Sequence, residues 1–153
     1  MIVVADSSPL NYLALIESLD LLRRLYGRIV VPQQVMLELI DPAAPYEVRK
    51  WASALPGWVD VRSLPPSNDP SLSHLDPGEQ SAILLAQLEA GALLLIDDAA
   101  GRLEASRRGI LTTGTRRPSR GGSEGSRGSA LCSHSAARDK FPRLNHTRGR
   151  SSR

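Results

Sequence analysis

The chain of 153 residues lacks several features, and each absence excludes a class of protein. It has one cysteine, Cys132, so no intrachain disulfide can form, which fits a reducing compartment. Its longest apolar stretches, such as 92–96, fall far short of the ~20 residues that a membrane span needs. The N-terminal segment has no basic start, and Asp6 interrupts its apolar run. We therefore expect no signal peptide, no membrane association and a cytoplasmic location.

Aromatic residues make up 4% of the sequence and hydrophobic residues 41%, so aliphatic side chains must fill the core. We expect Trp51 and Trp58 to pack against the core rather than to stack on bases. No metal-ligand spacing is shown by the three histidines, His74, His134 and His146. Cys132 and His134 are close in sequence but are too few to form a zinc site. The sequence also has no Gly-rich phosphate loop and no dinucleotide fingerprint.

Charge divides the chain into two parts. Residues 1–115 hold 9 basic and 14 acidic residues, a formal charge of −5. Residues 116–153 hold 10 basic and 2 acidic residues, a formal charge of +8. The sequence pI of 9.5 therefore describes the second part, and it is no evidence that the first part binds nucleic acid.

The second part also differs in composition. Of its 38 residues, 22 are Arg, Ser or Gly, and only Leu131, Phe141 and Leu144 are large aliphatic or aromatic residues. Such a segment cannot bury enough apolar surface to offset its ordering entropy. We predict one folded domain over 1–115 and a disordered tail over 116–153.

Apolar strands alternate with helices over the first part. The predicted strands are 1–5, 29–31, 58–61, 92–96 and 110–113. The predicted helices begin with Ser8 as N-cap and Pro9 as first helical residue, and continue at 19–26, 32–40, 46–55, 76–91 and 99–108. Strand 58–61 alternates apolar and polar residues, as an edge strand does. Strands separated by helices predict a three-layer α/β/α fold with a central parallel sheet of about five strands.

Five carboxylates follow or face the ends of these strands. Ligand sites in open α/β sheets lie beyond the carboxyl ends of the strands. Asp6 ends the first strand, and Asp97 and Asp98 end the fourth. Glu38 lies in the helix after the second strand, and Glu79 in the first turn of the helix before the fourth. If the first and fourth strands are neighbours, these acids can converge on one cleft. Clustered carboxylates need a neutralising cation, and oxygen ligands suit Mg²⁺ or Mn²⁺.

Most of these acids also have a purely structural interpretation. Glu79 could complete a capping box with Asp76. Asp97 could be a helix N-cap, and Asp98 could pair with Arg102 one turn later.

Two further acids differ in how well such an interpretation fits them. Glu38 could lie solvated on an exposed helical face. Asp6 is hardest to explain in this way, because a carboxylate directly after an apolar strand is costly unless it has a function, although N-capping is open to it. No single acid is decisive, and the prediction rests on the set.

Four segments together resemble a known family. Residues 4–13, 21–39, 75–86 and 94–102 resemble, in order, the four acidic motifs of PIN-domain proteins. The likeness covers about residues 1–115 and is greatest to the bacterial and archaeal branch allied to VapC toxins. Four motifs in the right order are much more specific than any one of them.

The resemblance implies an endoribonuclease that uses Mg²⁺ or Mn²⁺ and leaves a 5′-phosphate and a 3′-hydroxyl. It implies that three acids hold metal, namely Asp6, Glu38 and Glu79. Asp98 or Asp97 would hold a second metal or orient water, and Ser7 matches a hydroxyl position beside the first Asp. It also implies a toxin restrained by a small protein antitoxin, and a homodimer.

The sequence departs from the family after residue 115. Family members continue into a final helix with apolar spacing, whereas here Arg116 begins the Arg-rich tail. A frameshift in a GC-rich gene would produce this composition, which is our preferred hypothesis; an uninterrupted frame with this tail kept among close relatives would contradict it. Loss of the helix would expose apolar surface, and we expect lower stability or a damaged dimer.

Other functions compete with this interpretation. The chain could be an inactive PIN-like RNA-binding module or a frameshifted relic, with the tail binding phosphates by counterion release or staying solvated. A phosphotransfer receiver would need its paired acids near the first strand and a late Lys, both of which are lacking. An aspartyl-phosphatase would need Asp-x-Asp where this chain has Asp6 followed by two serines.

Overall fold

The computed structural model of the chain describes residues 1–65 and 67–115. The predictions made for 116–153, including the disordered tail, lie outside the described residues. Within them, five strands form one parallel sheet in the order β3-β2-β1-β4-β5. These strands are β1 (Val3–Ala5), β2 (Ile29–Pro32), β3 (Val59–Arg62), β4 (Leu93–Leu95) and β5 (Leu111–Thr113). The first and fourth strands are therefore neighbours, as convergence of the acids requires.

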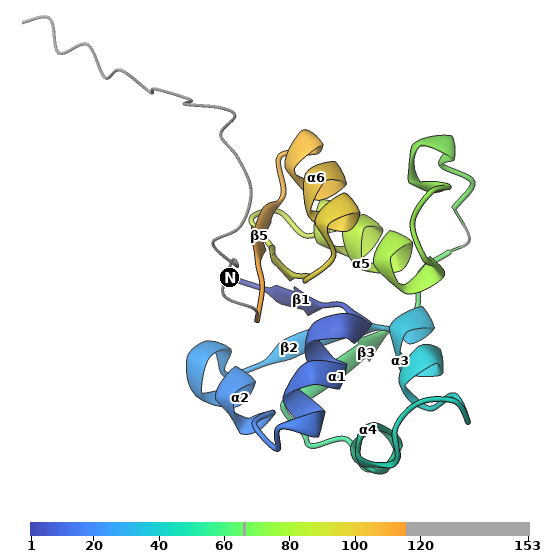
Figure 1. Cartoon of the computed structure of the whole chain (residues 1–153). Helices are drawn as coiled ribbons and strands as arrows, with labels where there is room; N and C mark the ends of the chain where they lie inside the picture. The colour runs from blue at the N-terminus through green and yellow to red at the C-terminus, as the bar shows by residue number, and fades with distance from the viewer. Residues whose placement is uncertain (66, 116–153) are drawn as a thin grey trace, which may run out of the picture. The chain divides into compact units, whose positions relative to one another are not determined.

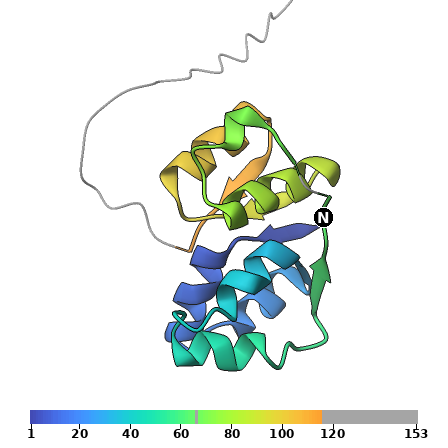
Figure 2. The ribbon, with the colours of Figure 1, turned by 90° about the vertical axis from the view of Figure 1, so that its right-hand side faces the viewer.

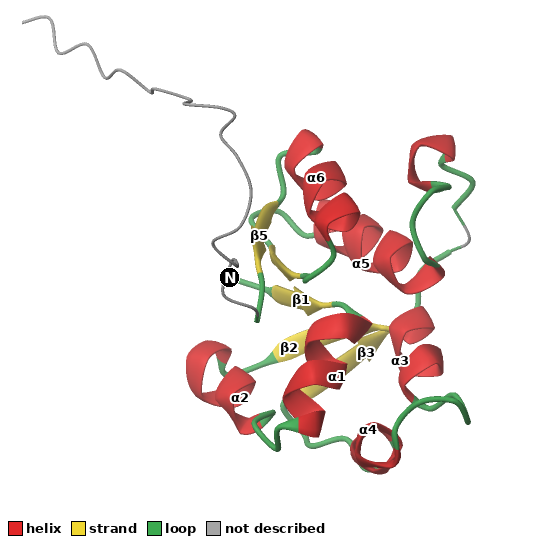
Figure 3. Cartoon of the chain, viewed as in Figure 1, coloured by secondary structure: helices red, strands yellow, loops and turns green. Residues whose placement is uncertain are grey.

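Helices cover both faces of the sheet (Figures 1 and 2). One face carries α1 (Ser7–Leu15), α2 (Asp20–Tyr26), α3 (Gln33–Leu39) and α4 (Tyr46–Ala52). The other face carries α5 (Pro77–Leu88) and α6 (Ala99–Arg107). A short 3-10 helix, η1 (Pro70–Leu72), interrupts the loop between β3 and α5 (Figure 3). The predicted α/β fold with a central parallel sheet of five strands is confirmed.

The core consists of two apolar layers, because successive strand residues point to opposite faces. Val3 and Ala5 of β1 belong to the layer beneath α1–α4, and Val4 belongs to the layer beneath α5 and α6. Burial on both faces explains why β1 is continuously apolar. Leu10 and Ile83 anchor the two helical layers with no exposed surface, and each burial stabilises the fold by about 1.5–3 kcal/mol.

Four predicted helix ends are wrong. The helices predicted over 46–55 and 76–91 end three residues early, at Ala52 and Leu88. α1 begins at Ser7, with Asp6 rather than Ser8 as N-cap, because Asp6 has an extended backbone and its carboxylate accepts the Ser8 N–H. Pro9 still lies in the first turn, where its missing N–H costs nothing. Ile40, predicted on the apolar side of the next helix, is the C-cap of α3 and is 45% exposed.

Other local predictions hold. β3 is an edge strand, and Trp51 and Trp58 pack against the core layer beneath α1–α4. Gly27 and Gly109 follow α2 and α6 with positive φ, a conformation that glycine adopts at little cost. Across the described part of the chain, we find no helix both long and apolar enough to cross a membrane.

Candidate metal centre at the carboxyl edge of the sheet

Asp6 lies at the centre of the candidate site. It directly follows the middle strand, and its N–H donates to the Leu95 carbonyl of β4 at 3.0 Å. The side chain is completely buried, and its Oδ2 accepts the Ser8 N–H at 3.3 Å. Its Oδ1 is also buried and has no hydrogen-bond partner among the residues that the structure describes. An unsatisfied buried carboxylate oxygen is costly, and a cation would satisfy it.

Burial raises the pKa of Asp6 from 3.8 to about 6. The backbone N–H groups of Ser7 and Ser8 oppose this rise by hydrogen bonding to the carboxylate, and the negative charge of Glu38 adds to it. Ser7 is half-buried, and its backbone is the part of it that acts on Asp6. Asp6 is thus a carboxylate whose charge is poorly compensated by the protein around it.

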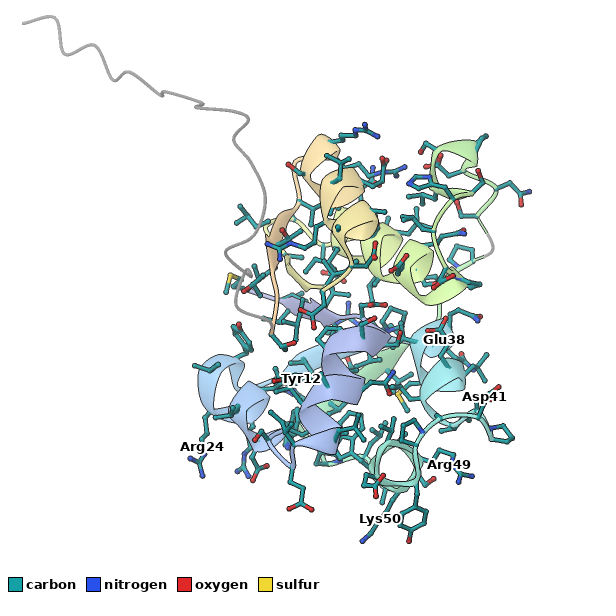
Figure 4. The ribbon with its side chains drawn as sticks, in the orientation of Figure 1. Tyr12, Arg24, Glu38, Asp41, Arg49 and Lys50 are labelled. Carbon is teal, nitrogen blue, oxygen red and sulfur yellow. The ribbon has the colours of Figure 1, made fainter. Side chains whose placement is uncertain are left out.

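Glu38 crosses from α3 to the start of α5 (Figure 4). Its Oε1 accepts the backbone N–H of Gly78 at 2.7 Å. A Cβ atom at position 78 would overlap the Glu38 carboxylate, so glycine is required for this approach. The interpretation of Glu38 as a solvated residue on an exposed helical face is therefore wrong.

The capping role considered for Glu79 is confirmed. Its carboxylate accepts the Asp76 N–H at 3.2 Å and completes a capping box at the start of α5. Its side chain also faces the acidic edge: the residue is 8% exposed, and burial raises its pKa from 4.5 to about 7. The hydrogen bond from Asp76 opposes the rise, and the charges of Asp98, Asp6 and Asp76 add to it.

The two acids that follow β4 have different hydrogen-bond partners. Asp98 is the N-cap of α6, with its Oδ2 accepting the Gly101 N–H at 2.9 Å. Asp97 accepts the Thr115 N–H at 2.7 Å through Oδ1 and the Thr115 hydroxyl through Oδ2. The alternative interpretation of Asp97 as a helix N-cap is therefore wrong, since Asp98 caps α6. The Asp98–Arg102 ion pair is likewise not formed within the described residues.

Repulsion between negative charges acts between neighbouring members of a series of four acids. The series runs Glu38, Asp6, Glu79 and Asp98. Asp97 is turned toward Thr115 instead, although with Ser8, Asp98 and Ala99 it lines a shallow pocket of about 250 Å³ at this edge. Each of the four acids accepts a backbone N–H. In the part of the chain described, no three acidic, His or Cys side chains are already gathered around one point.

These residues fit a hard divalent cation. All donors are carboxylate oxygens, which suit Mg²⁺ or Mn²⁺, and the unpaired Oδ1 of Asp6 would be a buried ligand atom for such an ion. Sequence reasoning missed Gly78 and Thr115, which position Glu38 and Asp97. Gly78 had a signal, because glycine within the first turn of a helix lowers its stability and needs a reason.

Comparisons with known proteins agree with this architecture. The family model DUF3368, described as a PIN domain, matches residues 2–116. The fold resembles the PIN domain endonuclease Utp24, with 14% identity over 76% of this chain and 86% of that one, at a TM-score of 0.54. A PilT N-terminus domain protein of the hyperthermophilic archaeon Sulfolobus solfataricus P2 matches with 18% identity over 74% and 87% of the two chains, at a TM-score of 0.49. No curated protein matches the chain. The family match spans most of the sequence, and the chain belongs to the PIN domain family.

Proposed function

We propose that this chain is a metal-dependent endoribonuclease that hydrolyses RNA phosphodiesters with Mg²⁺ or Mn²⁺. The observation that carries the proposal is Asp6, completely buried after the middle strand with one oxygen unpaired, and electrostatically linked to Glu38 and Glu79. Family membership supports it, and the structurally similar Utp24 is a PIN domain endonuclease.

The proposed ligands are the four linked acids, Asp6, Glu38, Glu79 and Asp98. A divalent cation at this edge would supply a nucleophile by lowering the pKa of water, and would neutralise charge on the scissile phosphate. Ser7 and Ser8 hold Asp6 in place through their backbone N–H groups. Asp97 is outside the proposed set of ligands, because its carboxylate accepts hydrogen bonds from Thr115.

The protonation of Glu79 offers a test of cation binding that does not depend on catalysis. Its pKa of about 7 means that a fraction of Glu79 is protonated at neutral pH. Cations bind carboxylates in the ionised form, so cation binding releases protons from the site. Mn²⁺ binding in weakly buffered solution should therefore acidify it, and more so below neutral pH than above.

The decisive experiment compares three proteins on a structured RNA pool in Mg²⁺, Mn²⁺ or EDTA. Asp6→Asn removes the central carboxylate. Asp41→Asn is the matched control, because Asp41 is exposed and its carboxylate accepts the nearby Ala43 N–H. Wild type and Asp41→Asn should cleave with either metal and stop in EDTA, and Asp6→Asn should be inactive. Cleavage that persists in EDTA, or in Asp6→Asn, contradicts the proposal.

The narrower role proposed for this nuclease is that of a toxin in a type II toxin–antitoxin pair. It is supported by the likeness of the four acidic segments to the VapC-allied branch, from which a protein antitoxin and a homodimer are also predicted. Induced expression in bacterial cells tests it. Growth arrest by wild type but not by Asp6→Asn is expected, whereas normal growth with active nuclease present would contradict the role.

A second candidate is a catalytically inactive RNA-binding module, the outcome also expected of a frameshifted relic. The formal charge of +8 over 116–153 favours it, because Arg-rich segments bind RNA by releasing counterions. Salt-sensitive RNA binding that disappears when 116–153 is deleted, without metal-dependent cleavage, would support this module. Binding that survives the deletion excludes it.

A further inference from the structure

Both tryptophans of the chain line one pocket at the amino edge of the sheet, the edge opposite to the acids. Trp51 lies in α4, and Trp58 directly precedes β3. The Trp58 carbonyl accepts the Ile29 N–H at the start of β2 at 3.1 Å, which places Trp58 at the amino ends of both strands. The pocket has a volume of about 340 Å³, within the range of about 300–1,000 Å³ that is usual for small-molecule sites.

The tryptophans give the pocket a fixed apolar wall. Each is half-buried and packs against the core layer beneath α1–α4, while the rest of its side chain lines the pocket. Side chains that the core already holds lose little freedom when a ligand binds. Among aromatic side chains, tryptophan attracts cations most strongly to the face of its ring. The apolar lining is completed by Leu19, Ala54 and Pro56.

Two carboxylates line the rest of the pocket, those of Glu17 and Asp20. Both residues are exposed, and within the described part of the chain neither side chain forms an ion pair or a hydrogen bond. No basic residue of the described ranges 1–65 and 67–115 lines the pocket. Glu17 has a positive φ of 54°, a conformation that favours glycine or asparagine, so the backbone does not explain a glutamate at this position.

This lining suits an organic cation with an apolar surface. Phosphates and carboxylates would be repelled by Glu17 and Asp20. A divalent metal ion would find too few ligands, since no three acidic, His or Cys side chains gather at one point among the described residues. A lysine ammonium is strongly hydrated, and a guanidinium would leave some of its N–H donors against apolar side chains. A trimethylammonium group has no N–H donor to satisfy, and it presents methyl groups to the tryptophans and charge to the carboxylates.

We infer that this pocket binds a trimethylammonium group, carried either by a small molecule such as choline or by a trimethylated lysine of another protein. The tryptophans contact its methyl groups, and the carboxylates of Glu17 and Asp20 neutralise its charge. The site goes beyond the proposed nuclease and is independent of it, because the candidate metal centre lies at the other edge of the sheet. Its occupancy is therefore measured without RNA.

Titration of the full chain with choline chloride tests the inference, with sodium chloride holding the ionic strength constant. Because both tryptophans line the pocket, their fluorescence reports its occupancy. Saturation transfer in proton NMR reports contact with the choline methyl groups by a second signal. The neutral analogue of choline, in which a tert-butyl group replaces trimethylammonium, has the same shape and should bind about tenfold more weakly. Methylguanidinium should also bind more weakly than choline.

Two peptides that differ only in one lysine side chain, trimethylated or unmodified, identify the source of the ligand. The trimethylated peptide should bind about tenfold more tightly than the unmodified one. If it also binds more tightly than choline, the pocket recognises a modified protein. If choline binds more tightly than the peptide, the pocket recognises a small molecule.

Two double variants locate the site. Glu17→Gln with Asp20→Asn removes both charges from exposed side chains that have no described partner, so it does not threaten folding and keeps both tryptophans. Asp41→Asn with Glu47→Gln is the matched control, because these exposed acids lie outside the pocket and change the net charge equally. The first variant should bind choline about tenfold more weakly than wild type, and the control should stay within about twofold.

Several outcomes would overturn the inference. One is the absence of both signals with choline and with the trimethylated peptide. Another is a neutral analogue or methylguanidinium that binds as tightly as choline. A third is choline binding that the two double variants weaken equally, because the net charge and not the pocket would then attract the cation. RNA cleavage enters none of these measurements, so the inference and the nuclease proposal stand or fall separately.

Discussion

Glu38 and Gly78, forty positions apart, meet where α3 approaches the start of α5, with the Glu38 Oε1 accepting the Gly78 N–H at 2.7 Å. The contact does two things at once. It holds a carboxylate beside Asp6, and it satisfies one of the free N–H groups at the start of α5. The absence of a side chain at position 78 is what permits the approach.

Gly78→Ala should displace Glu38 while leaving the fold intact. Alanine favours the helix by about 1 kcal/mol over glycine, which offsets part of the cost of moving the carboxylate. We expect Mn²⁺ affinity, measured by calorimetry, to fall by about 10- to 100-fold. Gly57→Ala is the control, since a Cβ there would meet nothing within 4 Å. Unchanged Mn²⁺ affinity in Gly78→Ala would show that Glu38 is no ligand.

Asp6→Asn should stabilise the metal-free protein at high pH. The pKa of Asp6 rises from 3.8 to about 6 on folding, so the folded state disfavours its charge. The contribution of Asp6 to the free energy of unfolding is therefore fully present below about pH 4 and is lost as the pH rises through about 6. The shift corresponds to about 3 kcal/mol, and asparagine also serves as an N-cap.

Urea unfolding in EDTA measures this effect. At about pH 8 the variant should exceed wild type by up to about 3 kcal/mol, and at about pH 4 the two should coincide. Mn²⁺ should then stabilise wild type more than Asp6→Asn. A variant that is less stable than wild type at both pH values would show that Asp6 is structural.

Asp97 and Asp98 should give opposite phenotypes. Asp98→Asn keeps an N-cap for α6 but removes a charge facing Glu79, so cleavage should fall by about 10- to 100-fold with little change in Tm. Asp97→Ala removes both acceptors for Thr115, so Tm should fall while cleavage stays within a few-fold of wild type. The reverse pattern would make Asp97 the ligand.

Arg108 should matter for stability and not for cleavage. Its guanidinium bonds Glu104 at 2.8 Å, Asp69 at 2.9 Å and Gln87 at 3.0 Å, so it ties the end of α6 to α5 and to the loop at η1. A lysine cannot reproduce these directions, so Arg108→Lys should lower Tm by several degrees. Arg107→Lys, at a largely exposed side chain, is the control and should change Tm little.

The hydrogen bonds and ion pairs of Arg108 also predict that the free energy of unfolding falls in acid. Hydrogen bonds from Ser71 and Arg108 hold the pKa of Asp69 at about 2, and those from Arg108 lower the pKa of Glu104. Depressed pKa values contribute stability above pH ~4 that is lost as pH falls toward 2. The Tm difference between wild type and Arg108→Lys should therefore shrink in acid. A constant difference would mean that the ion pairs contribute nothing.

Much of the fold could be predicted because its signals are local. The apolar runs at β1 and β4, the capping box of Asp76 with Glu79, and the glycines after α2 and α6 each act within a few residues. The parallel orientation of the strands could be predicted because the strands alternate with helices along the chain. The N-cap of α1 was misassigned because Asp6 and Ser8 are both good caps, and the choice depends on where β1 ends.

What the sequence determined by itself is the order of elements and the acids that end or adjoin the strands, because both follow from backbone and burial preferences within short segments. Only the tertiary structure decided that Glu38 turns to Gly78, that Asp98 joins Asp6 and Glu79, and that Asp97 turns to Thr115. These choices depend on which strands pair and on what packs beyond each strand end. Contacts between residues far apart in the chain have no local signal from which they could be predicted.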